Sequence, residues 1–137
     1  MYTCRSFFDA ATYRSEYYFS LLQEKGVKLA GFFEENNYSN IAIYGLNSIG
    51  KRLYEDLNSS GTSVKVKYFI DKYKKGQYKD VEIINLKNPE IENMDAIIVA
   101  PVLSFNQIVS ELLNQKISID KILHIDDVIF NLVWRYF

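Results

Sequence analysis

The chain contains few of the residues on which many sites and scaffolds depend. Among its 137 residues there are one cysteine, Cys4, and one histidine, His124. A disulfide framework and a thiolate zinc site each need at least two cysteines, so we expect neither. Two prolines and a single cysteine are typical of a protein of the reducing cytoplasm, and we expect this one to act there.

Long apolar runs and excess charge are also lacking. No segment approaches the ~18 consecutive apolar residues of a membrane-spanning helix, so we expect no membrane span. Residues 1–19 have no basic region followed by an apolar stretch, which argues against a signal peptide. The formal net charge is −1, so composition gives no electrostatic reason to expect nucleic acid as a partner.

From residue 41 onward, short apolar runs alternate with segments of helical periodicity. The runs begin near residues 41, 64, 81, 96 and 121. Ile49, Leu53 and Leu57 recur every fourth residue and predict a helix after the first run. The alternation predicts an α/β fold, a three-layer, Rossmann-like, doubly wound parallel sheet of about five strands in the order 3-2-1-4-5. The crossover between the third and fourth strands is short and is expected to lack a full helix.

Residues 1–40 follow a different pattern. Leu22, Leu29 and Phe33 belong to one or two amphipathic helices, which we expect to break near Gly26. We therefore predict a helical N-terminal extension, residues 1–40, packed on a Rossmann-like nucleotide-binding domain, residues 41–137. The extension is expected to have no separate core.

The extension is rich in aromatic residues: Phe7, Phe8, Tyr13, Tyr17, Tyr18 and Phe19. They exceed what one helix can bury against a sheet that other helices already cover. Because large aromatic surfaces are seldom left bare, we expect a homodimer, or docking to a sugar enzyme, through residues 1–40. The alternative is that these rings close one face of the sheet internally.

The stretch GLNSIGK (45–51) follows the first predicted strand and opens a helix. Gly45 and Gly50 stand at the first and last glycine positions of the dinucleotide fingerprint G-x-G-x-x-G. Asp71 follows roughly 20 positions later, at the end of the second strand, where a carboxylate accepts hydrogen bonds from a ribose. Asn47 replaces the middle glycine, and a side chain there weakens or redirects phosphate binding.

Two other interpretations fit the same turn. GLNSIGK also matches the P-loop G-x-x-x-x-G-K, but Arg52 stands where the Mg²⁺-binding Ser or Thr is required. Alternatively, Gly45 and Gly50 serve only a tight turn and close helix–strand packing. The fingerprint is favoured over both.

The segments FFEENNYSNIAIYGLNSIGKRLYEDL, VKYFID, DAIIVA and KILHIDDVI carry a family resemblance. Over residues 30–130 the chain resembles small Rossmann-like domains encoded with surface-polysaccharide and glycosyltransferase genes. These domains are similar to the nucleotide-binding domains of nucleotide-sugar epimerases, dehydratases and sugar acyltransferases. The resemblance implies a site for a nucleotide, NAD(P) or a nucleotide sugar at the glycine turn and Asp71.

The predicted cofactor-binding residues comprise the turn, the end of the second strand and the end of the fourth. They are Gly45, Leu46, Asn47, Ser48, Ile49, Gly50, Asp71, Lys72, Ala100 and Pro101. No nucleophile–base pair can be assembled, since His124 lies within an apolar strand and Asp126 and Asp127 are expected to cap the last helix. We therefore expect a nucleotide-binding module of polysaccharide or carbohydrate biosynthesis without independent catalysis. The alternative is a degenerate, non-binding Rossmann-like domain that docks a glycosyltransferase or another sugar enzyme.

Overall fold

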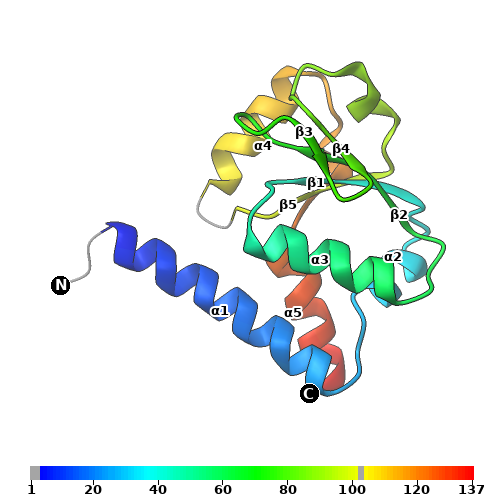
Figure 1. The fold of residues 1–137 in the computed structure, drawn as a ribbon. Coiled ribbons are helices and arrows are strands. Elements are labelled where there is room, and N and C mark those ends of the chain that lie inside the picture. Colours follow the sequence, from blue (N-terminus) through cyan, green and yellow to red (C-terminus); the bar gives the residue numbers. More distant parts are fainter. Residues whose placement is uncertain (1–3, 102–103) are drawn as a thin grey trace.

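The fold is an α/β sandwich in which helices cover both faces of one sheet (Figure 1). The computed structural model describes the backbone of residues 4–101 and 104–137 and the side chains of residues 14–101 and 104–137. The strands are β1 (Asn40–Tyr44), β2 (Lys65–Ile70), β3 (Gly76–Tyr78), β4 (Val81–Ile84), β5 (Ala96–Val99) and β6 (Ile122–His124). The α-helices are α1 (Cys4–Glu24), α2 (Ala30–Glu35), α3 (Ser48–Ser59), α4 (Phe105–Asn114) and α5 (Ile125–Tyr136), and short 3₁₀ turns form η1 (Pro89–Asn93) and η2 (Ile119–Lys121).

The sheet is mostly parallel, and its order is β3-β4-β2-β1-β5-β6. The predicted α/β class with a parallel sheet is confirmed, but the predicted order of five strands is incomplete. A sixth strand, β3, pairs antiparallel with β4 at the edge of the sheet. The five parallel strands follow one another in space as β4-β2-β1-β5-β6. As expected, only the 3₁₀ turn η1 connects β4 to β5.

Strand β3 was missed because its sequence carries no apolar pattern. Gly76, Gln77 and Tyr78 lie at the sheet edge and none is fully buried, so no burial pattern marks them as a strand. The hairpin to β4 turns at Lys79, which has a φ of 52°. Lysine is not a residue that predicts a left-handed turn.

The two faces of the central strand contact different sets of helices. Ile41 and Ile43 point into the cluster formed with α1, α2, α3 and α5, whereas Ala42 and Tyr44 belong to the cluster against η1 and α4. This alternation is the period of two that a strand requires. Because both faces are covered, β1 is apolar along its length, as is typical of a parallel central strand.

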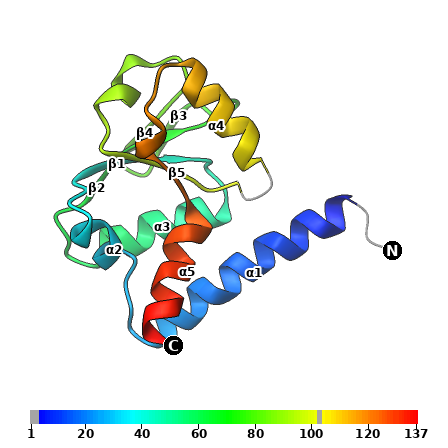
Figure 2. The same ribbon diagram turned by 180° about the vertical axis from the view of Figure 1, so that it is seen from behind.

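The described part of the extension shares the core of the sheet. Phe19 and Leu22 of α1 and Phe33 of α2 are fully buried in the cluster that holds Ile41 and Ile43. Figures 1 and 2 both show α1 beside α5, with the amino-terminal half of α1 extending past α3 and α5. Phe19 therefore closes a face of the sheet internally, as the alternative expectation for these rings had it, whereas the side chains of Phe7, Phe8 and Tyr13 lie outside the described residues.

A buried carboxylate joins the extension to α3. Asp56 is 2% exposed and accepts the Leu29 N–H at 3.0 and 3.2 Å, just before α2 begins. Burial raises the pKa of Asp56 above its ordinary value, although the N–H donors and Lys28 oppose that shift. The carboxylate satisfies backbone donors that would otherwise be orphaned at the start of a helix.

Candidate functional site

The glycine turn between β1 and α3 is held by close backbone packing. Gly45 has a φ of 110° and donates its N–H to the Ile70 carbonyl at 2.9 Å. A Cβ at Gly45 would lie 2.7 Å from Cδ of Pro101, and one at Gly50 would lie 2.3 Å from the Gly45 carbonyl oxygen. Both positions therefore require glycine. Both the packing interpretation and the dinucleotide fingerprint expect glycine at these two positions.

Asn47 caps α3 and occupies the position of the missing middle glycine. Its φ is −115°, and its Oδ1 accepts the Gly50 N–H at 2.9 Å. An N-cap side chain satisfies one of the orphan donors with which a helix start would otherwise bind an anion. At this turn, the acceptor for the Gly50 N–H is thus a side chain of the protein itself.

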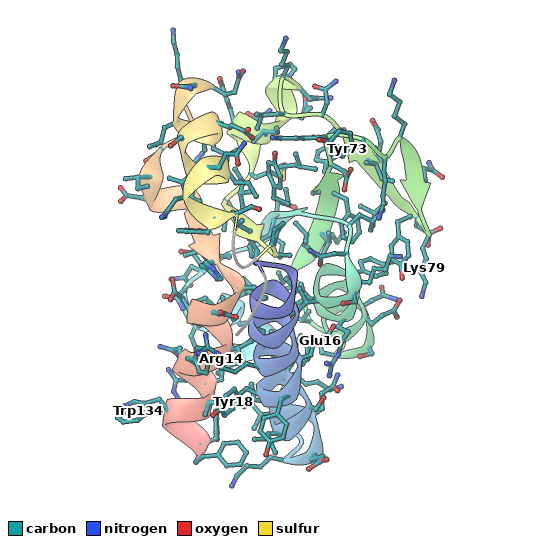
Figure 3. All side chains as sticks on the ribbon, turned by 90° about the vertical axis from the view of Figure 1, so that its left-hand side faces the viewer. Arg14, Glu16, Tyr18, Tyr73, Lys79 and Trp134 are labelled. Atoms are coloured by element: carbon teal, nitrogen blue, oxygen red, sulfur yellow. The ribbon has the colours of Figure 1, made fainter. Side chains whose placement is uncertain are left out.

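A second acceptor reaches the same turn from α1. The Ser48 hydroxyl donates to Oε1 of Glu16, which Figure 3 shows on the side of α1 toward α3. Arg52 fixes this contact by donating to the Glu16 carbonyl at 3.1 Å, to the Ser20 hydroxyl at 3.0 Å and to Oε1 of Gln23 at 2.8 Å. A carboxylate near a helix N-terminus is favoured by the helix dipole and repels a phosphate from it.

The P-loop interpretation fails on the position of its lysine. Lys51 Nζ lies 5.4 Å from the centre of the Tyr78 ring, directed toward β3 and away from the glycine turn. Arg52, at the position of the required Ser or Thr, binds α1. Neither side chain is placed to bind a triphosphate or its Mg²⁺.

Asp71 closes the turn after β2. Its Oδ1 accepts the N–H groups of Tyr73 and Lys74, each at 2.9 Å, and its Oδ2 accepts that of Leu46 in a longer contact of 3.4 Å. Burial alone would raise the pKa of Asp71, but these backbone donors and the Lys74 ammonium together hold it below its ordinary value. The side chain is ionised at neutral pH, and Oδ2 retains free acceptor capacity.

Beside Asp71, a network of hydrogen-bonded polar side chains connects the end of β2 to α4. Lys72 Nζ lies 2.6 Å from Oε1 of Glu111, and the Tyr44 hydroxyl donates to Oε2 of the same carboxylate at 3.3 Å. The bond from Lys72 lowers the pKa of Glu111. Burial and the neighbouring Glu111 raise the pKa of Tyr44 far above its ordinary value, so its hydroxyl stays protonated.

These segments enclose a crevice of about 330 Å³ where β1, β2 and β5 end. The chain continues to opposite faces of the sheet after β1 and β5, so the crevice lies at a topological switch point, where open α/β sheets bind ligands. Its lining is Tyr44, Gly45, Asp71, Lys72, Tyr73, Pro101, Ser104, Gln107 and Ile108.

The predicted site residues separate into two groups. Gly45, Asp71, Lys72 and Pro101 line the crevice. Six do not: Asn47 caps the helix, Ser48 binds Glu16, and the remainder, Leu46, Ile49, Gly50 and Ala100, are buried in packing.

Sequence reasoning missed Tyr44, Gln107 and Glu111. The available signal was the spacing of Gln107 and Glu111, four residues apart on the helix that follows the switch point. Ser104 stands at the N-cap position of α4, but its side chain makes no capping bond there.

The single histidine has a structural role in the last crossover. Nδ1 of His124 accepts the Asp126 N–H at 3.0 Å, so His124, not the two aspartates, caps α5. Asp126 instead accepts a hydrogen bond from Ser15 of α1. Within the described residues, no three His, Cys, Asp or Glu side chains are grouped so as to hold a metal ion.

Comparison with protein family models and with curated proteins finds no match to this chain. Among the described helices, none combines the length and apolarity that crossing a bilayer requires.

Proposed function

We propose that the chain is a Rossmann-like module that binds a mononucleotide or a nucleotide sugar in the crevice at the switch point, in carbohydrate or polysaccharide biosynthesis, without independent catalysis. The observation that carries the proposal is the ionised carboxylate of Asp71 in the lining of this crevice. Its Oδ2 has the capacity to accept a ribose or sugar hydroxyl. The low cysteine content is the reason to place this activity in the cytoplasm.

Neighbouring side chains supply the other contacts of a nucleotide. Tyr73 is 88% exposed beside Asp71 and offers a flat face for a base or a sugar ring. The Lys72 ammonium binds Glu111 with one of its three N–H donors, and the other two are available for a phosphate oxygen. The crevice therefore has one acceptor, one aromatic face and one cation for a single nucleotide unit.

A full dinucleotide such as NAD(P) is the less favoured ligand. Its pyrophosphate would need the start of α3, where Asn47 and Glu16 already supply acceptors. The same observation favours the second candidate function, a module that has lost nucleotide binding and docks a glycosyltransferase or another sugar enzyme.

Calorimetric titration with UMP, UDP-glucose, ATP, NAD⁺ and NADP⁺ tests the proposal. UMP or UDP-glucose should bind, and at 100 times its dissociation constant it should add ~2.7 kcal/mol to the free energy of unfolding. Asp71→Asn keeps the Oδ1 acceptor for Tyr73 and Lys74 but removes the charge. It should raise the dissociation constant about tenfold or more, because a hydrogen bond to a charged group is lost.

Asp95→Asn is the matched control. The Asp95 carboxylate likewise accepts two backbone N–H groups, from Ser39 and Asn40, and its pKa is likewise lowered by them. It lies where β1 and β5 begin, at the opposite end of the sheet, so its variant should bind as the wild type does. Equal loss in both variants would remove Asp71 from the site, and no binding by any probe would favour the docking function.

A further inference from the structure

A second cavity adjoins the crevice at the end of β2. It measures about 360 Å³ and lies where β2 and β4 end, whereas the crevice lies where β1, β2 and β5 end. Asp71 and Lys72 line both cavities. The Asp71 N–H donates to the Ile84 carbonyl at 3.1 Å, which holds the ends of β2 and β4 together. A ligand that contacts Asp71 therefore lies at the junction of the two cavities.

The crevice alone is small for the proposed ligand. Its volume of about 330 Å³ is at the lower end of the ~300–1,000 Å³ of small-molecule sites, so a nucleoside fills it. The start of α3 offers little to the phosphoryl groups, because Asn47 accepts the Gly50 N–H and Glu16 binds Ser48 there. The second cavity is the neighbouring space that offers these groups room.

Two asparagines supply the second cavity with hydrogen-bond donors. Oδ1 of Asn85 accepts the Lys87 N–H at 2.9 Å, and Oδ1 of Asn88 accepts the Glu90 N–H at 2.9 Å. Each amide oxygen is thus held by the backbone, and the NH₂ group is the end available to a ligand. Among the described residues, neither NH₂ group has a hydrogen-bond partner. Two fixed donor groups in one cavity favour a ligand rich in acceptor oxygens.

Three lysines add positive charge to these donors. Lys74 is held in place, since its ammonium donates to the Leu46 carbonyl at 2.6 Å. Lys72 contacts Glu111 from the crevice side. Within the described part of the chain, Lys75 forms no ion pair, so its ammonium is available to a ligand.

Two carboxylates in the lining, Asp71 and Glu82, oppose an anion. Asp71 already accepts three backbone N–H groups, while Glu82 lies exposed on β4. Three lysines face these two carboxylates, so the lining carries a net positive charge. A phosphoryl group has several charged acceptor oxygens and fits ammonium and amide donors together.

We propose that the second cavity binds the distal phosphoryl group of a nucleoside diphosphate, or of its sugar derivative, whose nucleoside lies in the crevice. Lys72 lines both cavities and contacts the proximal phosphate between them. The proposal rests on the proposed function, since the crevice holds the nucleoside. It goes further by selecting a diphosphate over a monophosphate and by placing the phosphates at the ends of β2 and β4, away from the start of α3.

Calorimetric titration with UMP and UDP tests the proposal. UDP should bind the wild type about tenfold more tightly than UMP, because its distal phosphoryl group gains charge-assisted hydrogen bonds. Asn88→Asp keeps the Oδ1 acceptor for the Glu90 N–H but replaces the NH₂ donor by a charged oxygen. It should abolish the advantage of UDP and leave the dissociation constant of UMP nearly unchanged. Lys75→Gln should reduce this advantage, and Glu82→Gln should increase it about two- to fivefold.

Lys87→Gln is the matched control for Lys75→Gln. Lys87 is also exposed, between β4 and η1, but it does not line the second cavity, so this variant should keep the advantage of UDP. An equal loss in both lysine variants would overturn the inference, because it would show only long-range attraction. So would equal affinities of UMP and UDP in the wild type, or an advantage of UDP that persists in Asn88→Asp. In these cases the binding of UMP would leave the proposed function intact, whereas binding of neither nucleotide would overturn both.

Discussion

Replacing Gly50 by alanine tests the packing on which the crevice depends. The added Cβ would lie 2.3 Å from the Gly45 carbonyl oxygen, and the next nearest atoms, Oδ1 of Asn47 and Cγ2 of Ile43, lie at 3.3 Å. The closest atom belongs to the backbone of the turn, so it cannot move aside as a flexible side chain would. The start of α3 must therefore shift away from β1.

The expected magnitude follows from two opposing terms. Overpacking a well-packed site destabilises a protein by ~1–3 kcal/mol and occasionally more, whereas alanine gains up to ~1 kcal/mol over glycine in a helix. A backbone contact this short lies at the severe end, so we expect a net loss of about 2 kcal/mol. For a chain of this size that corresponds to a fall in the melting temperature of about 6 °C.

Gly31→Ala is the matched control for Gly50→Ala. Gly31 also lies in a helix, α2, but nothing lies within 4 Å of the Cβ position. This variant should therefore be neutral or up to ~1 kcal/mol more stable than the wild type. Urea denaturation of both variants measures the difference. If Gly50→Ala were as stable as Gly31→Ala, the account of the glycine turn would be refuted.

Two further variants test the charges and caps around this framework. Because burial raises the pKa of Asp56, its contribution to stability is fully present below the unfolded pKa of about 4 and is lost as the pH rises through the folded value. The free energy of unfolding of the wild type, relative to Asp56→Asn, should therefore fall in urea titrations as the pH rises above about 4, and a constant difference would show that Asp56 keeps its ordinary pKa. At the cap of α3, Asn47→Ala should lose ~1 kcal/mol but Asn47→Gly only a few tenths, since glycine is tolerated at an N-cap. Equal losses, again from urea denaturation, would mean that the cap contributes little.

Apolar patterning was sufficient to predict the framework. Runs such as Ile41–Tyr44 and Ala96–Val99 are apolar on both faces, and only a covered parallel strand permits this. Ile49, Leu53 and Leu57 recur at every fourth residue and predicted α3, and all three side chains are buried. Strand β3 has no such pattern, because an edge strand can pair through its backbone alone.

The interior of the site was less predictable, because polar side chains choose among several partners. Asn47 suggested a weakened phosphate loop, but the sequence alone did not reveal that it would cap Gly50. In the sequence, Arg52 stood out only because it departs from the P-loop motif. Its role depends on α1, which is separated from α3 along the chain by α2 and β1. Such contacts depend on which elements the fold brings together, and the spacing of residues along the chain does not predict this.

Mapping amide chemical shifts during titration with UDP-glucose tests the central claim most directly. We predict that the amides of Gly45, Tyr73 and Ser104, which line the crevice, shift together and saturate, while that of Gly61, at the far end of α3, does not move. Saturating shifts confined to residues outside the crevice would contradict the assignment of this crevice as a nucleotide site. So would the absence of any shift at UDP-glucose concentrations well above the dissociation constants of typical nucleotide sites.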